Sequence, residues 1–537
     1  MGAHALAVVQ EKDEETIAPF GASRQRFEQL VETMGSLKAL SMTHRELEDL
    51  LTTDGREVLR QLLQDHLTLR GPGYATEPVV DGDGVAHTHV RKQTRDLETV
   101  FGTVRVERAG YGGRGLDSLH PLDAELNLPA ERYSHGVRRR LAVEAARGSF
   151  DAAVEAVATT TGAHVPKRQA EEEVVRAAAD FDAFYREREE ASRREVRSTG
   201  SILALTTDGK GVVMRSSDLR PATRRAAAKR QHKLKRRLSK GEKRCRKRMA
   251  QVASVYTVAP FVRRPEDLVA ELRGDDAEVV VRPRPEHKRV WASVEKDAEE
   301  VIGDLFEEAL RRDPERRKRW VALVDGNLTQ LDNLLAQAKR HAIELTIVVD
   351  IIHVLDYVWK AAWAFHAEGS PEAERWVDER FLEILRGRAS WVAAGMRRSA
   401  TLRGLAAEDR AAVDDCADYL LNYAPYLRYD QHLADGLPIS TGVIEGACRH
   451  LVKDRMDITG ARWTVRGAEA VLRVRALRAS GDFDVYWGFH EEQERQLNYE
   501  MAYAGPVPPV AHPTRPSPAA PSRSTEKPRG SQLRLVP

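Results

Sequence analysis

The stretch SILALTTDGKGVVMR, residues 201–215, decides the fold class of this 537-residue chain. Its apolar first half predicts a strand with a polar tip at Asp208, and the glycines that follow predict a tight turn into a second strand. Residues 249–263 are also β-rich, residues 317–327 form an apolar run that ends at Asp-Gly, and residues 342–365 suit a strand that feeds a helix. Strands interleaved with helices in this way predict an α/β protein with a mixed sheet and flanking helices.

The region before this sheet is predicted to be mainly helical. Residues 25–70 have helical spacing, and residues 96–112 alternate with the period of a β-hairpin. Residues 150–178 resemble a helix-turn-helix, whose second helix lies in the DNA major groove and would place Lys167 and Arg168 on DNA. An ordinary pair of helices with solvated basic side chains is the alternative.

The charge of the chain is unevenly distributed. The net charge is only +2, yet residues 220–248 carry fifteen Lys or Arg and one acid, which indicates a solvated surface or one that faces a polyanion. The three cysteines lack a metal-binding spacing, which argues against a structural zinc site or a disulfide scaffold and favours a reducing compartment. Because no secretory signal or long apolar run is found, we expect a soluble cytoplasmic protein.

Three carboxylates stand out by position. Asp208 and Asp325 each close an apolar run and precede a glycine, and ligands of α/β sheets bind at strand ends; Glu445 comes from a predicted helix much later. Singly, each has an ordinary explanation, because Asp-Gly is common in turns and a glutamate near a helix start complements the helix dipole. Together they would concentrate negative charge that a divalent cation relieves. Oxygen ligands favour Mg²⁺ or Mn²⁺, and two such ions ~3.5–4 Å apart suit phosphodiester chemistry.

Four motifs carry a resemblance to a known family. They are TTDGKGV (206–212), VDGN (324–327), VVDIIHVLDYVWKAAWAFH (348–366) and TGVIEGACRHLVKDRMDITGARW (441–463). They resemble the ISKra4 family of bacterial insertion-sequence transposases, which are DDE transposases with an RNase H-like fold, related to the Mutator-like enzymes. The resemblance covers about residues 90–490, and its last motif is long and quite specific.

The resemblance implies a catalytic site that holds two Mg²⁺ or Mn²⁺ ions. Asp208 would be the first catalytic acid and metal ligand, and Glu445 the third. The second would be Asp325, while Asp350 with His353 is the alternative second acid, or a pair that orients a metal ligand.

The resemblance also implies DNA as the substrate. The partners would be terminal inverted repeats and target DNA, and the protein would act as a homodimer or a larger synaptic complex in the bacterial nucleoid. Phosphate contacts are expected from the basic block and from residues that flank the active site: Lys210, Arg236, Arg237, Arg244, Arg449, Lys453, Arg455, Arg462 and Trp463.

The sequence predicts six successive regions. They are a disordered N-terminus (1–22), a helical DNA-binding region (23–195), the first part of an RNase H-like core (196–365), a helical insertion (366–438), the last part of the core with Glu445 (439–490) and a disordered Pro-rich tail (491–537). The expected activity is strand cleavage and strand transfer at element ends. A DNA-binding protein without chemistry, or another RNase H-like nuclease, are the alternatives.

Overall fold

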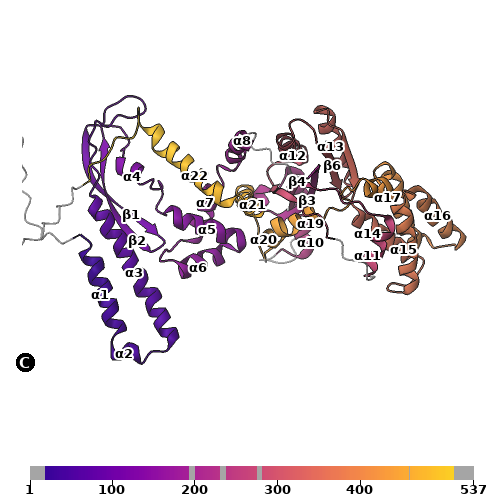
Figure 1. Cartoon of the computed structure of the whole chain (residues 1–537), viewed down its shortest axis with the longest axis horizontal. Helices are drawn as coiled ribbons and strands as arrows, with labels where there is room; N and C mark the ends of the chain where they lie inside the picture. The colour runs from indigo at the N-terminus through magenta and orange to yellow at the C-terminus, as the bar shows by residue number, and fades with distance from the viewer. Residues whose placement is uncertain (1–18, 193–199, 230–237, 275–280, 459, 513–537) are drawn as a thin grey trace, which may run out of the picture. The chain divides into compact units, whose positions relative to one another are not determined.

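The computed structural model describes residues 19–192, 200–229, 238–274, 281–458 and 460–512, and shows a mixed α/β protein rich in helix (Figure 1). The chain forms two compact units. One comprises residues 1–132 with 495–537, and the other residues 133–494. The predicted region 23–195 is therefore divided, and the helix-turn-helix-like segment belongs to the unit that holds the large sheet. The predicted boundary at 195 lies outside the described residues.

The smaller unit is built on helices and one β-hairpin. Its elements are α1 (Gly21–Met34), α2 (Leu37–Leu40), α3 (His44–Arg70), β1 (His89–Thr99), β2 (Gly102–Gly112), α4 (Pro121–Glu125) and the 3₁₀ turn η4 (Glu500–Ala502). A capping box starts α3: the Glu46 N–H donates to Thr43 Oγ1 (3.4 Å), and the Thr43 N–H donates to the Glu46 carboxylate (2.7 Å). The predicted hairpin is confirmed, because Thr99 pairs with Gly102 and the register continues along both strands.

Part of the predicted tail is ordered. Residues 491–512 were expected to be disordered, but they contain the end of a helix and the turn η4, and Tyr503 and Val510 are buried in the hydrophobic core of the smaller unit. The prediction failed because a proline-rich composition hid these two apolar anchors, which form isolated bridges with Asp81 and Ala75. Residues 513–537 lie outside the described part of the chain.

The larger unit contains a five-stranded sheet in the order β5-β4-β3-β6-β7. Strands β3, β4 and β5 are antiparallel neighbours, and β6 and β7 continue the sheet parallel to β3. The strands are β3 (Ile202–Val213), β4 (Lys247–Val258), β5 (Glu286–Ser293), β6 (Arg319–Val324) and β7 (Leu345–Val349). In the sequence, the basic block (220–248) lies between β3 and β4, except for its last two residues, Lys247 and Arg248, which begin β4.

One sequence prediction about β3 is wrong. The glycines at 209 and 211 do not form a turn, since β3 pairs with β4 without interruption from Ile202 to Val213. A Cβ at Gly209 would lie 2.9 Å from the Met249 side chain, and one at Gly211 would lie 2.7 Å from the Lys247 side chain. These glycines therefore permit close packing inside a strand.

Helices surround the sheet and form the rest of the larger unit. They are α5 (His135–Arg147), α6 (Phe150–Thr160), α7 (Lys167–Arg176), α8 (Phe181–Ser192), η1 (Ser216–Asp218), α9 (Pro221–Ala228), α10 (Lys240–Arg244), α11 (Pro265–Arg273), α12 (Ala298–Arg312), α13 (Leu328–Arg340), α14 (Ile351–Ala362), α15 (Pro371–Leu385), α16 (Ala389–Leu402), α17 (Ala407–Asn422), η2 (Ala424–Tyr426), α18 (Tyr429–Ala434), α19 (Gly442–Ala447), the π-helical turn η3 (Cys448–Lys453), α20 (Asp454–Met456) and α21 (Val465–Ser480). Helix α22 (Phe483–Asn498) follows. The helix pair predicted at 150–178 is confirmed as α6 and α7.

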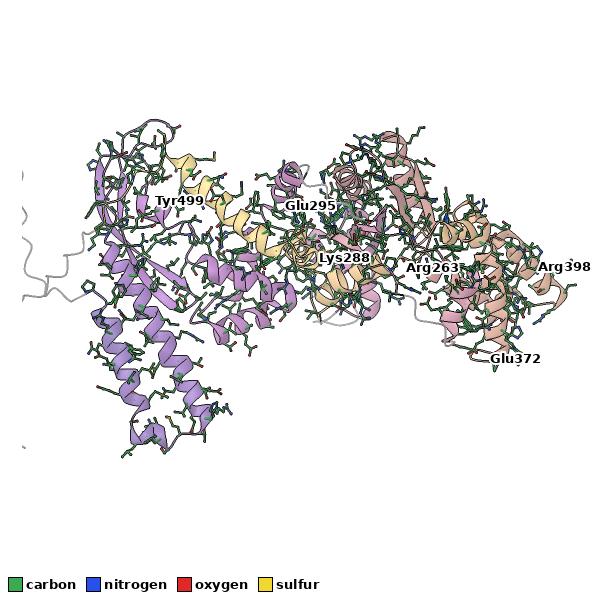
Figure 2. All side chains as sticks on the ribbon, in the orientation of Figure 1. Arg263, Lys288, Glu295, Glu372, Arg398 and Tyr499 are labelled. Atoms are coloured by element: carbon green, nitrogen blue, oxygen red, sulfur yellow. The ribbon has the colours of Figure 1, made fainter. Side chains whose placement is uncertain are left out.

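The predicted helical segment after β7 is also confirmed. Trp376 and Phe381 on α15 are buried, but Trp391 on α16 is 67 % exposed and is not a core residue. Glu372 on α15 and Arg398 on α16 are exposed in this segment (Figure 2). Among the described residues, no helix combines the length and apolar character needed to cross a membrane.

Candidate metal centre

Three aspartates lie in one row across the parallel strands. The β3–β6 register pairs Thr206 with Leu323, and the β6–β7 register pairs Val324 with Val349. If the first register is extended by two residues, Asp208 comes level with Asp325. If the second register is extended by one residue, Asp325 comes level with Asp350. Strands β6 and β7 end there, so the row lies at their carboxyl edge, where α/β sheets bind ligands.

Asp350 is the most buried of the three, with no exposed side-chain surface. It caps α14, because the His353 N–H donates to its Oδ2 (3.2 Å), and the His353 Nδ1 lies 2.6 Å from the same oxygen. Its Oδ1 accepts from the Thr441 N–H (2.8 Å). Both oxygens thus already accept hydrogen bonds, and Asp350 holds together the start of α14 and the chain that leads into α19.

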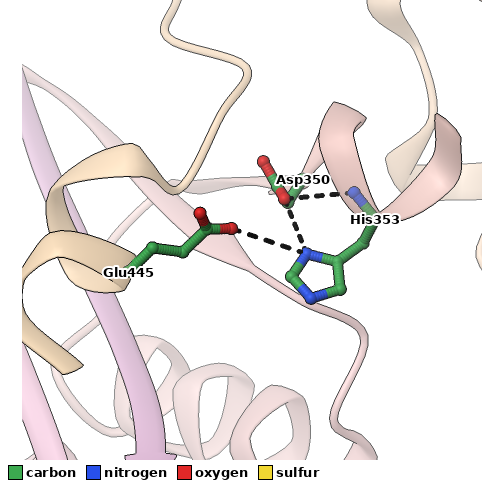
Figure 3. Close-up of side chains that lie close together, drawn as sticks. All are labelled: Asp350, His353 and Glu445. Atoms are coloured by element: carbon green, nitrogen blue, oxygen red, sulfur yellow. Dashed lines mark hydrogen bonds and ion pairs between the residues drawn. The ribbon is translucent and has the colours of Figure 1, made fainter. Parts of the chain in front are cut away.

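Glu445 extends from α19 towards this pair (Figure 3). Its Oε1 lies 4.0 Å from the His353 Nδ1 and accepts from the Thr441 hydroxyl (3.3 Å). Thr441 occupies the N-cap of α19, but its hydroxyl contacts the carboxylate instead of capping the helix. Ligand atoms of Asp350, His353 and Glu445 all lie within 4.8 Å of one another, so this cluster could hold a metal ion.

Asp208 and Asp325 lie beside this cluster. The Asp208 Oδ2 accepts from the Cys448 thiol (3.0 Å), and its Oδ1 accepts from the Gly209 N–H (2.6 Å). The Asp325 Oδ1 accepts from the Asn327 N–H (3.0 Å), as expected where a strand turns at Gly326. Both aspartate side chains are half-buried, so both are accessible to a ligand.

The pKa shifts indicate that the charges of these groups affect one another. Burial, assisted by the negative charge of Asp208, raises the pKa of Asp325 above its usual range. The hydrogen bond to Asp350 raises the pKa of His353, and the charges of Asp325 and Glu445 act in the same direction. Burial and the Asp208 carboxylate raise the pKa of the Cys448 thiol, which is therefore protonated and able to donate. A cation would relieve the repulsion between the carboxylates.

The predicted ligands are only partly brought together. Glu445 lies against Asp350 and His353, the alternative pair, whereas Asp208 and Asp325 are neighbours in the row of aspartates. The Asp350 carboxylate has no exposed side-chain surface and is hydrogen-bonded to His353, which suits a residue that orients His353. The half-buried Asp325 suits a direct ligand better.

Two residues of the site escaped the sequence analysis. Cys448 and Thr441 contact Asp208 and Glu445, respectively. Their spacing could have indicated them, because Thr441 and Cys448 are four residues before and three residues after Glu445, and such residues share one helix face. No sequence pattern, however, connects Cys448 with an aspartate on β3.

The predicted DNA-binding residues fall into three groups. Arg236 and Arg237 lie outside the described residues. Lys210 on β3, Arg244 at the end of α10, and Arg449 and Lys453 on η3 lie elsewhere in the larger unit. Lys167, Arg168, Arg455, Arg462 and Trp463 line one pocket, although Arg455 and Trp463 are only 2 % and 7 % exposed and thus do not form a surface patch.

Comparison with known proteins gives no family for this chain: no family model matches it, and a search of the curated proteins finds no match.

Proposed function

We propose that this protein is a metal-dependent DNA transposase of the DDE type that cleaves element ends and transfers the strand. The observation that carries the proposal is the row of Asp208, Asp325 and Asp350 at one sheet edge, with Glu445 and His353 facing it. This agrees with the resemblance of the same residues to ISKra4-family motifs. A mixed sheet with flanking helices is compatible with the RNase H-like type that the resemblance implies.

The donor set fits hard divalent ions. Four carboxylates and one imidazole offer mostly oxygen ligands, which favours Mg²⁺ or Mn²⁺ over zinc. Two such ions would activate a water or a 3′-hydroxyl and stabilise the leaving oxygen of a phosphodiester. Asp208, Asp325 and Glu445 would hold the ions, and Asp350 would fix the orientation of His353.

The proposed substrate is double-stranded DNA. The basic connection between β3 and β4 and the exposed Arg449 and Lys453 on η3, which follow Glu445 on the same helical segment, support this choice. Such side chains bind phosphates through charge, and the binding weakens as salt rises. The partners would be element ends and target DNA, held by two or more copies of the chain.

The test uses purified protein and linear DNA that carries the sequences flanking its gene. We expect cleavage and end joining with Mg²⁺ or Mn²⁺ and none with a chelator. Asp208→Asn and Glu445→Gln should each lose activity by about 10³-fold or more, because each removes a carboxylate that would hold an ion stabilising the transition state. Glu372→Gln, which changes an exposed acid on α15, is the matched control and should be fully active.

The outcomes separate the alternatives. Binding without cleavage would indicate a DNA-binding protein without chemistry, and cleavage without joining would indicate a nuclease. Full activity of both acid variants would refute the site while leaving the enzyme class standing.

A further inference from the structure

The pocket lined by Lys167, Arg168, Arg455, Arg462 and Trp463 lies in the larger unit and is formed by segments far apart in sequence. Its volume is about 490 Å³. Residues of α6 and α7 line it together with residues 458, 460–464, 466 and 467. Six basic side chains face it against three acidic ones; the basic ones are Lys167, Arg168, Arg215, Arg455, Arg462 and Arg466.

Arg455 is the central feature of this pocket. It is 2 % exposed, and its guanidinium lies against the rings of Phe150 and Trp463, at 5.3 Å and 4.7 Å from the ring centroids. Its Nε–H donates to the Ala145 carbonyl (2.8 Å), but its Nη2 is buried without a hydrogen-bond partner. Burial and the charge of Arg475 lower the pKa of Arg455 to about 10, so it stays charged at neutral pH.

Burying a cation whose N–H donor has no acceptor costs free energy, unless an anion binds and accepts a hydrogen bond from that donor. None of the three acids of the pocket fills this role, because the Arg455 Nη2 has no hydrogen-bond partner among the described residues. Asp151 pairs with Lys167 (2.6 Å) and Glu172 with Arg168 (3.4 Å), and these pairs are solvent-exposed and weak. The contacts with the two aromatic rings and with the Ala145 carbonyl restrict the guanidinium, which prepares it to bind an oxyanion.

The pocket has a fixed relation to the row of aspartates. Trp463 forms a parallel bridge with Met214, and the Arg215 N–H donates to the Trp463 carbonyl (2.7 Å), so the pocket lies just beyond the end of β3. Asp208 on β3 is six residues before Met214, which corresponds to about 20 Å at ~3.3 Å per residue. For a duplex whose axis runs along β3, at a rise of ~3.4 Å per nucleotide of one strand, this separation corresponds to about six nucleotides.

We propose that this Arg455 pocket binds a backbone phosphate of a DNA strand, about six nucleotides from the phosphodiester at the row of aspartates. The choice of DNA as the source of the phosphate rests on the proposed function. Arg455 supplies the buried donor, and Arg462 and Arg466 at the rim supply further charge. Arg455 is thus a binding residue, at a distance from the reacting atoms.

The first test measures duplex binding by the full-length protein in a chelator, where no cleavage occurs. Arg455→Met keeps the bulk and removes the charge. We expect its affinity to fall about tenfold or more, and the slope of log K against log salt to fall by about one. Arg455→Lys should recover part of the affinity. Arg462→Ala, at an exposed position, should lower the slope similarly even if Arg455 variants fold poorly, and Arg398→Ala on α16 is the matched control with no change.

A second test locates the phosphate. Duplexes with a single neutral methylphosphonate, placed at successive positions from the cleavage site, should bind the wild type more weakly only near about six nucleotides. The Arg455→Met variant should not respond to that substitution. A response at no position would overturn the inference.

A third arm compares sources of phosphate. Inorganic phosphate at millimolar concentration is added to the wild type and to Arg455→Met, and the melting temperatures are measured. If phosphate stabilises only the wild type, and both proteins bind the duplex equally well, then the pocket binds free phosphate and the assignment to DNA is wrong. Folded variants of Arg455 and Arg462 with wild-type affinity and slope would also overturn it. Arg455-dependent binding without cleavage would keep the pocket and reject only the transposase chemistry.

Discussion

Asp325 directly follows β6, and extending the register of β6 with the parallel strand β3 by two residues places Asp325 level with Asp208, whose charge adds to burial in raising the pKa of Asp325. In the metal-free protein this pair is electrostatically unfavourable. Carboxylates whose pKa values are perturbed in this way are typical of sites that bind a ligand, and they do not stabilise the fold.

Replacing Asp325 by asparagine should therefore separate stability from function. Asn keeps the acceptor for the Asn327 N–H and removes the repelled charge. We expect Asp325→Asn to stabilise the metal-free protein at neutral pH by about 1 kcal/mol and to abolish cleavage. Urea unfolding and the cleavage assay measure the two effects. A variant that is less stable and still cleaves DNA would contradict the prediction.

Metal binding should depend on the protonation of His353. Its pKa is raised, first by the hydrogen bond to Asp350, so the charged imidazolium persists above about pH 6.5 and repels a cation. Calorimetry with Mn²⁺ should show tighter binding as pH rises through this pKa. His353→Gln should flatten the dependence.

The same shift predicts how His353 affects folding. A raised pKa contributes stability that is complete below the unfolded pKa, about 6.5, and is lost as pH rises through the folded pKa. His353→Gln should therefore destabilise the metal-free protein at about pH 6 and have little effect at about pH 9. Equal effects at both values would show that its charge plays no part.

Glu308 on α12 should be the main acid-sensitive group near the sheet. Burial alone would raise its pKa, but Arg289, Arg312 and Arg311 hold the pKa well below its usual range. Since the folded pKa is depressed, its stabilisation is present above the unfolded pKa, about 4.5, and is lost as pH falls towards the folded value. Glu308→Gln should cost about 3 kcal/mol at pH 7, and the difference from wild type should shrink in acid-unfolding measurements.

Thiol labelling should distinguish the three cysteines. Burial raises the pKa of Cys416 to about 12, and Cys448 is buried with its thiol donated to Asp208. Cys245 is half-buried and should be the one that reacts in the native protein, because labelling needs an accessible thiolate. Mass spectrometry should detect one labelled thiol before unfolding and three after it. Rapid native labelling of Cys448 would contradict its contact with Asp208.

The strands that carry the aspartates could be predicted because their signals are local. The apolar runs of β6 and β7 each end at an aspartate, the apolar first half of β3 leads up to Asp208, and a glycine follows Asp325 at positive φ. Strand β5 could not be found in this way. Its first half is exposed and charged, and only its last four residues are buried, against β4.

The roles of the acids depended on contacts that the sequence does not contain. Asp350 and Asp325 are alike in sequence, since both follow an apolar run. Asp350 is distinguished by the Thr441 N–H, which comes from 91 residues later and engages one of its oxygens. Gly209 was ambiguous for a related reason, because a glycine serves a turn and a close strand contact equally well.

The π-helical turn η3 sets the angular phase between Glu445 and Arg455. A π turn is equivalent to one inserted residue, and each residue of an α-helix rotates the following side chains by about 100°. The wider turn absorbs this extra residue, so Glu445 can face the row of aspartates while Arg455 still contacts the rings of Phe150 and Trp463. Inserting a further residue into Cys448–Lys453 would rotate Arg455 away from these rings, so this segment should tolerate substitutions at its exposed positions far better than an insertion.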